Sequence, residues 1–181
     1  MKLKNWIFLT LIVGLMSSCL TVEKKEYSFK LSGKESGILT IKYTNIMSIM
    51  DEEADVSEDD FNELITNYIE GDEIEKSYPD AKNIKKKLFE ENGKLCGEVS
   101  MEFESLKDVG LYLHNKKAPL MYYLSGGLGM ETFDKSNGEY GGEVMPVVFW
   151  SNKQKDLNVS TIVTEPDETT VSLLDQYKKW K

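Results

Sequence analysis

Apolar and polar residues alternate in two stretches near the start of the folded chain, Tyr27–Leu31 and Leu39–Tyr43. A period of two residues is typical of a strand that has one buried face. The residues between these stretches, 32–37, are rich in serine and glycine, so we predict a β-hairpin. Leu157–Thr164 is predicted to be the last strand of the chain.

The dipeptide Asn92-Gly93 predicts a second hairpin, because both residues readily adopt the positive φ angles of a type I′ turn. The register counted outward from this turn pairs opposite charges on one face: Glu91 with Lys94, and Lys87 with Glu98. The apolar residues of both arms then share the other face, as in a sheet that is solvated on one side. Lys86 and Glu90 are exceptions, since this register places them on the apolar face.

Asn137-Gly138 predicts a third hairpin, with Val144–Trp150 as its returning arm. Pro146 lacks a backbone N–H and therefore indicates an edge strand or a bulge in that arm. Together with the last strand, these hairpins predict a sheet made of antiparallel neighbours.

The clearest predicted helix begins at Ser57, a favourable N-cap that is followed by three acidic residues at the positive end of the helix dipole. Its apolar residues recur at helical spacing and form one stripe: Phe61, Leu64, Ile65, Tyr68 and Ile69. Gly71 is placed to end this helix. Shorter helices are predicted for residues 105–113, which begin with a capping box, and 169–181.

The predicted fold class is therefore α+β, an antiparallel sheet built from β-hairpins with helices packed on one face. Residues 27–181 are long enough to form a single domain with a sizeable core. The order of the strands does not follow from the sequence.

The first 18 residues have the composition of an export signal. A short positive segment, Met1–Asn5, precedes the apolar run Trp6–Met16. At about 1.5 Å per helical residue, this run falls well short of the ~30 Å hydrocarbon core of a bilayer. We therefore predict a signal peptide over residues 1–18 instead of a membrane-spanning helix.

The signal peptide ends in Leu15-Met16-Ser17-Ser18-Cys19, which resembles the bacterial lipobox. Met16 departs from the usual leucine of that motif. The resemblance implies that Cys19 receives a diacylglyceryl group and becomes the first residue of a mature lipoprotein. Acyl chains add about 0.8 kcal/mol of membrane affinity per buried methylene, so more than one chain anchors a protein stably. The alternative is an ordinary signal peptide that leaves Cys19 as a free thiol.

The residues after Cys19 bear on where the lipoprotein is held. Residues 19–26 are predicted to be the lipidated terminus and a short polar tether, and Leu20–Glu26 would reach roughly 25 Å when fully extended. No acidic residue directly follows Cys19, which resembles release from inner-membrane retention in some bacteria. The predicted location is therefore the outer membrane, on its periplasmic face.

Charge and composition exclude several functions. Removing Lys2 and Lys4 with the signal peptide takes the net charge from −9 to −11. This charge opposes binding to nucleic acid and opposes lying flat on an anionic membrane. All 22 basic residues are lysines, which weakens any hypothesis of phosphate recognition. With Cys19 acylated, Cys96 is the only cysteine left, so no internal disulfide is expected.

No metal, cofactor or catalytic site is predicted. The acidic run Asp51–Asp60 fails as an EF-hand loop, because Val56 and Asn62 stand at the sixth and twelfth positions. A looser calcium site or a solvated loop both remain open there. Gly126–Gly129 lacks the residues of a nucleotide-binding loop, and His114 is the only histidine.

The aromatic residues in the second half of the chain could line a ligand groove or pack in the core. They lie in Met121–Leu124 and at Phe149 and Trp150, and core packing is the favoured interpretation.

The chain as a whole is similar to many uncharacterised envelope lipoproteins. The leading functional hypothesis is a non-enzymatic binding or scaffolding module, with the membrane as one partner through Cys19 and an envelope protein or polysaccharide as another. The alternative is a carboxylate-based hydrolase of envelope polysaccharide, since such chemistry needs only two suitably spaced acids. A weaker alternative is a lipid or small-molecule carrier, which would need a deep apolar cavity.

Overall fold

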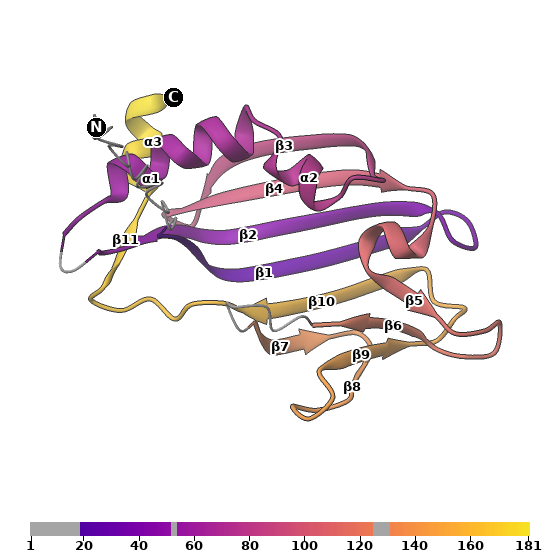
Figure 1. Cartoon of the computed structure of the whole chain (residues 1–181). Coiled ribbons are helices and arrows are strands. Elements are labelled where there is room, and N and C mark those ends of the chain that lie inside the picture. Colours follow the sequence, from indigo (N-terminus) through magenta and orange to yellow (C-terminus); the bar gives the residue numbers. More distant parts are fainter. Residues whose placement is uncertain (1–18, 52–53, 125–130) are drawn as a thin grey trace, which may run out of the picture.

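The computed structural model describes residues 19–51, 54–124 and 131–181, and it confirms the α+β fold class. Two antiparallel sheets make up most of the molecule, and a few short helices accompany them (Figure 1). The predicted signal peptide lies outside the described residues.

The larger sheet contains the long strands of the first two hairpins. Its strands are, in spatial order, β3 (Lys82–Glu91), β4 (Lys94–Phe103), β2 (Gly37–Ile49), β1 (Leu20–Leu31), β10 (Asp156–Ile162) and β7 (Thr132–Ser136), and β11 (Thr170–Ser172) pairs with the end of β2. Strands β1 and β2 are central and are hydrogen-bonded on both sides.

The smaller sheet packs against one end of the larger one. Its strands are, in order, β5 (Leu111–Leu113), β6 (Leu120–Tyr123), β9 (Val147–Trp150) and β8 (Glu139–Tyr140). The first core cluster lies between the two sheets and includes Phe29 and Leu39 from the large sheet and Val148 and Trp150 from the small sheet.

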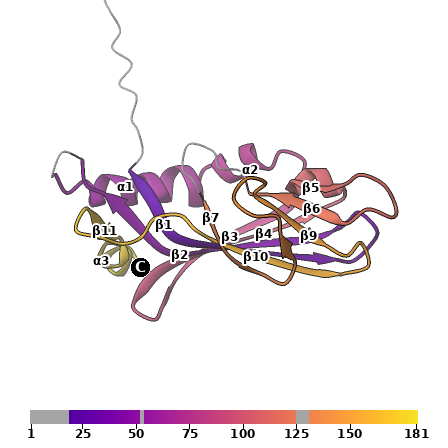
Figure 2. The same cartoon turned by 90° about the horizontal axis from the view of Figure 1, so that it is seen from below.

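The helices flank the other end of the large sheet. They are α1 (Ser57–Glu63), the π-helical segment η1 (Leu64–Ile69) that continues it, α2 (Glu73–Ser77) and α3 (Leu174–Trp180), and a 3-10 turn η2 (Leu106–Val109) precedes β5. In Figure 2, α1 and α2 lie on the same side of the large sheet as β5 and β6. This sheet face is thus divided between the helices α1 and α2 and the small sheet, a division that the sequence does not predict (Figure 2).

The second core cluster joins the helices to the sheet. Phe61 and Leu64 pack with Leu95 of β4 and with Leu173 and Tyr177 at the C-terminal helix. Strand β2 reaches this cluster because Asn45 adopts a left-handed backbone conformation, with φ of 57°. This breaks the alternation of the strand, so that residues 45–48 are all buried.

The second hairpin is confirmed together with its register. Glu91 pairs with Lys94 and Lys87 with Glu98, and Asn92 and Gly93 both have positive φ. The exception Lys86 is explained by its contacts: its side chain is 11% exposed, and Nζ donates to the Gly71 carbonyl at 2.6 Å and to Glu75 at 3.0 Å.

The third predicted hairpin is wrong. Asn137-Gly138 follows β7, which pairs with β10 in the large sheet, and precedes β8, which pairs with β9 in the small sheet. Neither residue has the positive φ of a type I′ turn. Instead, Asn137 Oδ1 accepts hydrogen bonds from Trp150 Nε1 at 2.8 Å and from the Asn158 N–H at 2.9 Å. The dipeptide therefore connects the two sheets.

Three other segments differ from their predicted structure. Residues 20–26, predicted to be a tether, form the first half of β1. Of the helix predicted over 105–113, only the capping box at Ser105 and the turn η2 form, and β5 follows directly. The helix predicted from residue 169 begins at Leu174, because residues 170–172 pair with β2 as β11.

Candidate functional site

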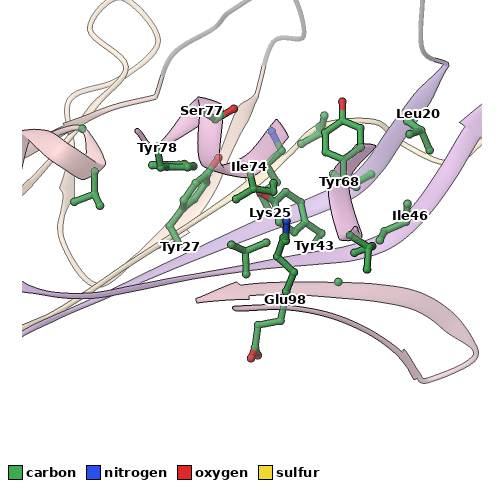
Figure 3. Close-up of a pocket in the computed structure, with 18 of the residues that line it drawn as sticks. Leu20, Lys25, Tyr27, Tyr43, Ile46, Tyr68, Ile74, Ser77, Tyr78 and Glu98 are labelled. Atoms are coloured by element: carbon green, nitrogen blue, oxygen red, sulfur yellow. The ribbon is translucent and has the colours of Figure 1, made fainter. Parts of the chain in front are cut away.

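A groove of about 930 Å³ runs over the central strands, between the helices and the small sheet (Figure 3). Each of its sides is built by a different part of the chain. Its floor comes from β1, β2, β3 and β4, one wall from η1 and α2, and the other wall from η2 and β6.

The floor is set by the register of the central strands. Lys25 on β1 is paired with Tyr43 on β2, and Tyr43 is paired with Gly97 on β4, so the three positions form one row across the sheet. Gly97 has no side chain, and a Cβ there would lie 3.2 Å from Cδ1 of Ile46. Ile46 and Leu88 therefore pack closely over Gly97, and all three residues belong to the lining of the groove.

The helical wall is mainly aliphatic and aromatic. Leu64, Tyr68 and Ile69 line it from η1, Ile74 lines it from α2, and Tyr78 lines it from the position directly after α2. The sequence pattern places the three residues of η1 on the predicted apolar stripe, where a covering layer of protein would be expected. Because the small sheet packs farther along the large sheet, part of this stripe faces the groove.

Aromatic contacts fix the opposite wall. Tyr122 of β6 packs against Tyr27 and Phe29, with ring centroids 5.5 Å and 5.3 Å apart. Tyr123 follows it at the rim, where its side chain is 58% exposed. Figure 3 shows Tyr27, Tyr43 and Tyr78 gathered around the groove.

Burial keeps these tyrosines protonated. Desolvation raises the pKa of Tyr27, Tyr43, Tyr78 and Tyr122, and nearby Tyr and Glu131 side chains add to the effect. The phenols are therefore neutral hydrogen-bond donors at any physiological pH and cannot serve as phenolate bases. Within the described part of the chain, the hydroxyls of Tyr43 and Tyr78 have no hydrogen-bond partner, so both can donate to a ligand.

An ion pair neutralises the lysine of the floor. Lys25 Nζ lies 2.7 Å from Glu131, whose side chain is 12% exposed. The same carboxylate accepts hydrogen bonds from Tyr27 at 3.2 Å and from Thr161 at 2.8 Å. Because the charges of Lys25 and Glu131 compensate each other, the deep part of the groove has little net charge.

The acids that line the groove are engaged in structural contacts or exposed to solvent. Glu98 forms an ion pair with Lys87 at 2.8 Å, and the Asp108 carboxylate accepts from the Ser105 N–H at 2.8 Å as part of the capping box. Asp80 is exposed. None of these contacts brings two acids together for the carboxylate chemistry of the hydrolase hypothesis.

In the described part of the acidic run Asp51–Asp60, two carboxylates have ordinary hydrogen-bond partners. Asp55 accepts from the Ser57 N–H at 2.9 Å, and buried Asp60 accepts from the Ser48 hydroxyl. No group of three or more His, Cys, Asp or Glu side chains suited to a metal ion occurs among the described residues.

Cys19 stands at the very start of β1, and its carbonyl accepts a hydrogen bond from the Ile49 N–H at 2.8 Å. Burial, and then the charges of Asp60, Asp51 and Glu63, raise the pKa of its thiol. The other cysteine, Cys96, is fully buried in β4.

The aromatic residues singled out in the sequence divide between the two interpretations. Tyr122 and Tyr123 line the groove, whereas Leu124 and Trp150 are buried in the core. His114 Nδ1 lies 3.3 Å from the hydroxyl of the exposed Tyr112. Gly126–Gly129 lies outside the described residues.

Sequence reasoning missed the contributions of β1 and α2 to the groove. Residues 20–22 line one end of it, although they were predicted to be a tether. The usable signal was the apolar character of Leu20 and Val22, which is unusual for a solvated linker.

Comparisons of the chain with protein-family models, with curated proteins and with solved structures gave no match. Within the described ranges, no helix is long and apolar enough to cross a membrane.

Proposed function

We propose that this chain is a lipoprotein of the bacterial cell envelope, anchored through a lipid on Cys19, that binds an amphiphilic ligand in the groove. The observation that carries the proposal is the composition of the groove. Aliphatic walls adjoin two tyrosine hydroxyls without a described partner, and the groove begins at Leu20, the residue after the predicted anchor. We extend the binding-module hypothesis in this way because such a site suits a ligand that has an apolar chain and a polar group.

The chemistry of the lining selects among ligands. Leu64, Ile69 and Ile74 offer hydrocarbon surface, and each methylene moved from water to such a surface gains about 0.8 kcal/mol. Tyr43 and Tyr78 donate hydrogen bonds, and the compensated charge of Lys25 does not favour a free anion. An acyl chain that carries an uncharged ester meets these requirements, because ester oxygens accept hydrogen bonds without bearing charge.

Polysaccharide binding, hydrolysis and scaffolding fit the groove less well. A polysaccharide would stack on open aromatic faces, yet much of the helical wall is aliphatic. A hydrolase would need an acid and a second carboxylate directed at one bond, and the lining acids Glu98 and Asp108 are bound to neighbouring groups. A scaffolding role would not require a groove of this volume.

The test uses the mature lipoprotein reconstituted in vesicles with a monoacylglycerol that carries a photoreactive diazirine in its chain. Cross-links should concentrate in the peptides that contain Tyr68 and Ile74. The double substitution Tyr43→Phe/Tyr78→Phe removes two hydrogen bonds of about 0.5–1.5 kcal/mol each, so cross-linking at subsaturating ligand should fall roughly tenfold.

Tyr112→Phe is the matched control, because Tyr112 is 56% exposed and lies outside the groove lining. This variant should cross-link as the wild type does. Cross-links that are spread evenly over the surface, or that are equal in all three proteins, would refute the proposed site.

A further inference from the structure

The predicted anchor joins the fold without a linker. Leu20 is the first residue of β1 and packs against the second core cluster, and the carbonyl of Cys19 is hydrogen-bonded to Ile49 of β2. Consecutive Cα atoms are only about 3.8 Å apart, so a lipid on Cys19 would hold this end of the large sheet at the surface of the bilayer. The orientation of the domain would then be restricted, which a flexible tether would not achieve.

The same end of the molecule carries the C-terminal helix. In both views, α3 and β11 lie beside the start of β1 and the beginning of α1 (Figures 1 and 2). The contacts agree with this placement, because Leu173, Leu174 and Tyr177 belong to the cluster against which Leu20 packs.

This end also exposes large apolar side chains. Trp180 is 51% exposed, although its ring meets Phe61 edge-on, with centroids 6.3 Å apart. Ile49, the residue hydrogen-bonded to Cys19, is 37% exposed. A half-buried indole has an apolar body and a polar N–H, and it therefore favours the interface between lipid chains and water.

The charges on α3 suit a phospholipid surface. Lys178, Lys179 and Lys181 surround Trp180, and of these Lys178 forms an ion pair with Glu90 at 3.3 Å. Long lysine side chains can extend toward headgroup phosphates while an adjacent indole sits deeper. The net charge of −11 opposes adsorption of the whole domain, so a contact limited to α3 is favoured over a broad face. Asp51 and Glu63 lie near Cys19 and oppose contact with an anionic surface there, which leaves α3 as the part of this end that suits the bilayer.

We propose that this end of the domain rests on the bilayer that holds the anchor, with Trp180 in the headgroup region and the lysines of α3 around it. The proposal depends on the lipidation of Cys19 that is part of the proposed function. It also gives the groove an orientation, because the end lined by Leu20–Val22 would open next to the membrane.

Tryptophan fluorescence tests this contact directly. The mature protein would have two tryptophans, Trp180 and Trp150, and Trp150 is 2% exposed in the core. The lipoprotein, with its lipid verified by intact mass, is reconstituted in phosphatidylethanolamine–phosphatidylglycerol vesicles with or without brominated chains. We expect bromine to quench the Trp180 emission at least twofold and to leave the Trp150 emission, measured in Trp180→Phe, unchanged.

A transplanted tryptophan supplies the control. Val144 is fully exposed in the connection between β8 and β9, on the small sheet. In Trp180→Phe/Val144→Trp, the new indole should remain unquenched. Absence of quenching of Trp180 in protein of the lipidated mass overturns the orientation alone. An unmodified Cys19 overturns both the anchor and the orientation, whereas the groove is tested separately by cross-linking.

Discussion

Replacing Asn137 by alanine tests whether this side chain links the two sheets. Its Oδ1 accepts from Trp150 Nε1 and from the Asn158 N–H, and its Nδ2 donates to the Asp156 carbonyl at 2.9 Å. Trp150 is 2% exposed and its Nε1 donates to this amide, so loss of Asn137 leaves the indole N–H without its protein partner. A buried donor without a partner costs about 1–3 kcal/mol, and the two backbone groups lie in exposed positions where water replaces the amide.

We therefore expect Asn137→Ala to lower the free energy of unfolding by about 2–3 kcal/mol. The measurement is urea unfolding of the mature protein at fixed detergent concentration, followed by circular dichroism and by tryptophan fluorescence. Asn115→Ala is the matched control, since Asn115 caps only exposed backbone N–H groups, and it should cost less than about 1 kcal/mol. Equal losses in the two variants would refute the role assigned to Trp150 and Asn137.

Three further predictions concern other contacts. Gly138→Ala should cost about 2–3 kcal/mol in the same assay, because its Cβ would lie 2.5 Å from Trp150 Nε1; a neutral result would contradict this close approach. Lys86→Met should lower the free energy of unfolding by about 1–2 kcal/mol, because the Gly71 carbonyl after η1 loses its hydrogen-bond donor. An unchanged free energy of unfolding would show that water replaces the lysine. The hydrogen bond from Lys94, which outweighs the effect of burial, lowers the pKa of Glu23. The stabilisation that this carboxylate provides is therefore present above its unfolded pKa of about 4.3 and disappears as the pH falls through its lower folded pKa. The free energies of unfolding of wild type and Glu23→Gln should therefore differ at neutral pH and converge at low pH. A difference that stays constant with pH would contradict this.

The second hairpin could be predicted down to single pairs because its determinants are local. Asn92 and Gly93 set the turn, and the charges of Lys87 and Glu98 agree with the register that the turn imposes. The helix that begins at Ser57 was likewise predictable from its apolar stripe. In each case neighbouring residues carry the whole signal.

The failures occur where distant contacts override a local preference. Asn137-Gly138 has the same composition as Asn92-Gly93, yet the Trp150 indole donates a hydrogen bond to the amide of Asn137. The segment after Gly138 then pairs in the small sheet and does not return along β7. Leu20–Glu26 has a polar pattern, but pairing with β2 and β10 satisfies its backbone groups and makes it a strand.

The groove could not be predicted from the sequence, since its sides come from segments far apart in the chain. Of the residues that the sequence offered as groove candidates, Met121–Leu124, Phe149 and Trp150, only Tyr122 and Tyr123 line the groove. Tyr43 lies in β2 and Tyr78 directly after α2, and the relative placement of these elements depends on the packing of the whole sheet. The groove residues can be read from the sequence, but the fact that they lie side by side cannot.

The left-handed residue Asn45 has a consequence for how the protein fluctuates. Strand β2 serves the core between the sheets with its first half and the helical core with its second half, so neither core can open without disturbing the same backbone. Amide hydrogens of β1 and β2 should consequently exchange with solvent only in the global unfolding event, and their exchange rates should be similar along both strands. A ligand bound in the groove would then slow amide exchange at both ends of the molecule, because both ends open in the same unfolding event.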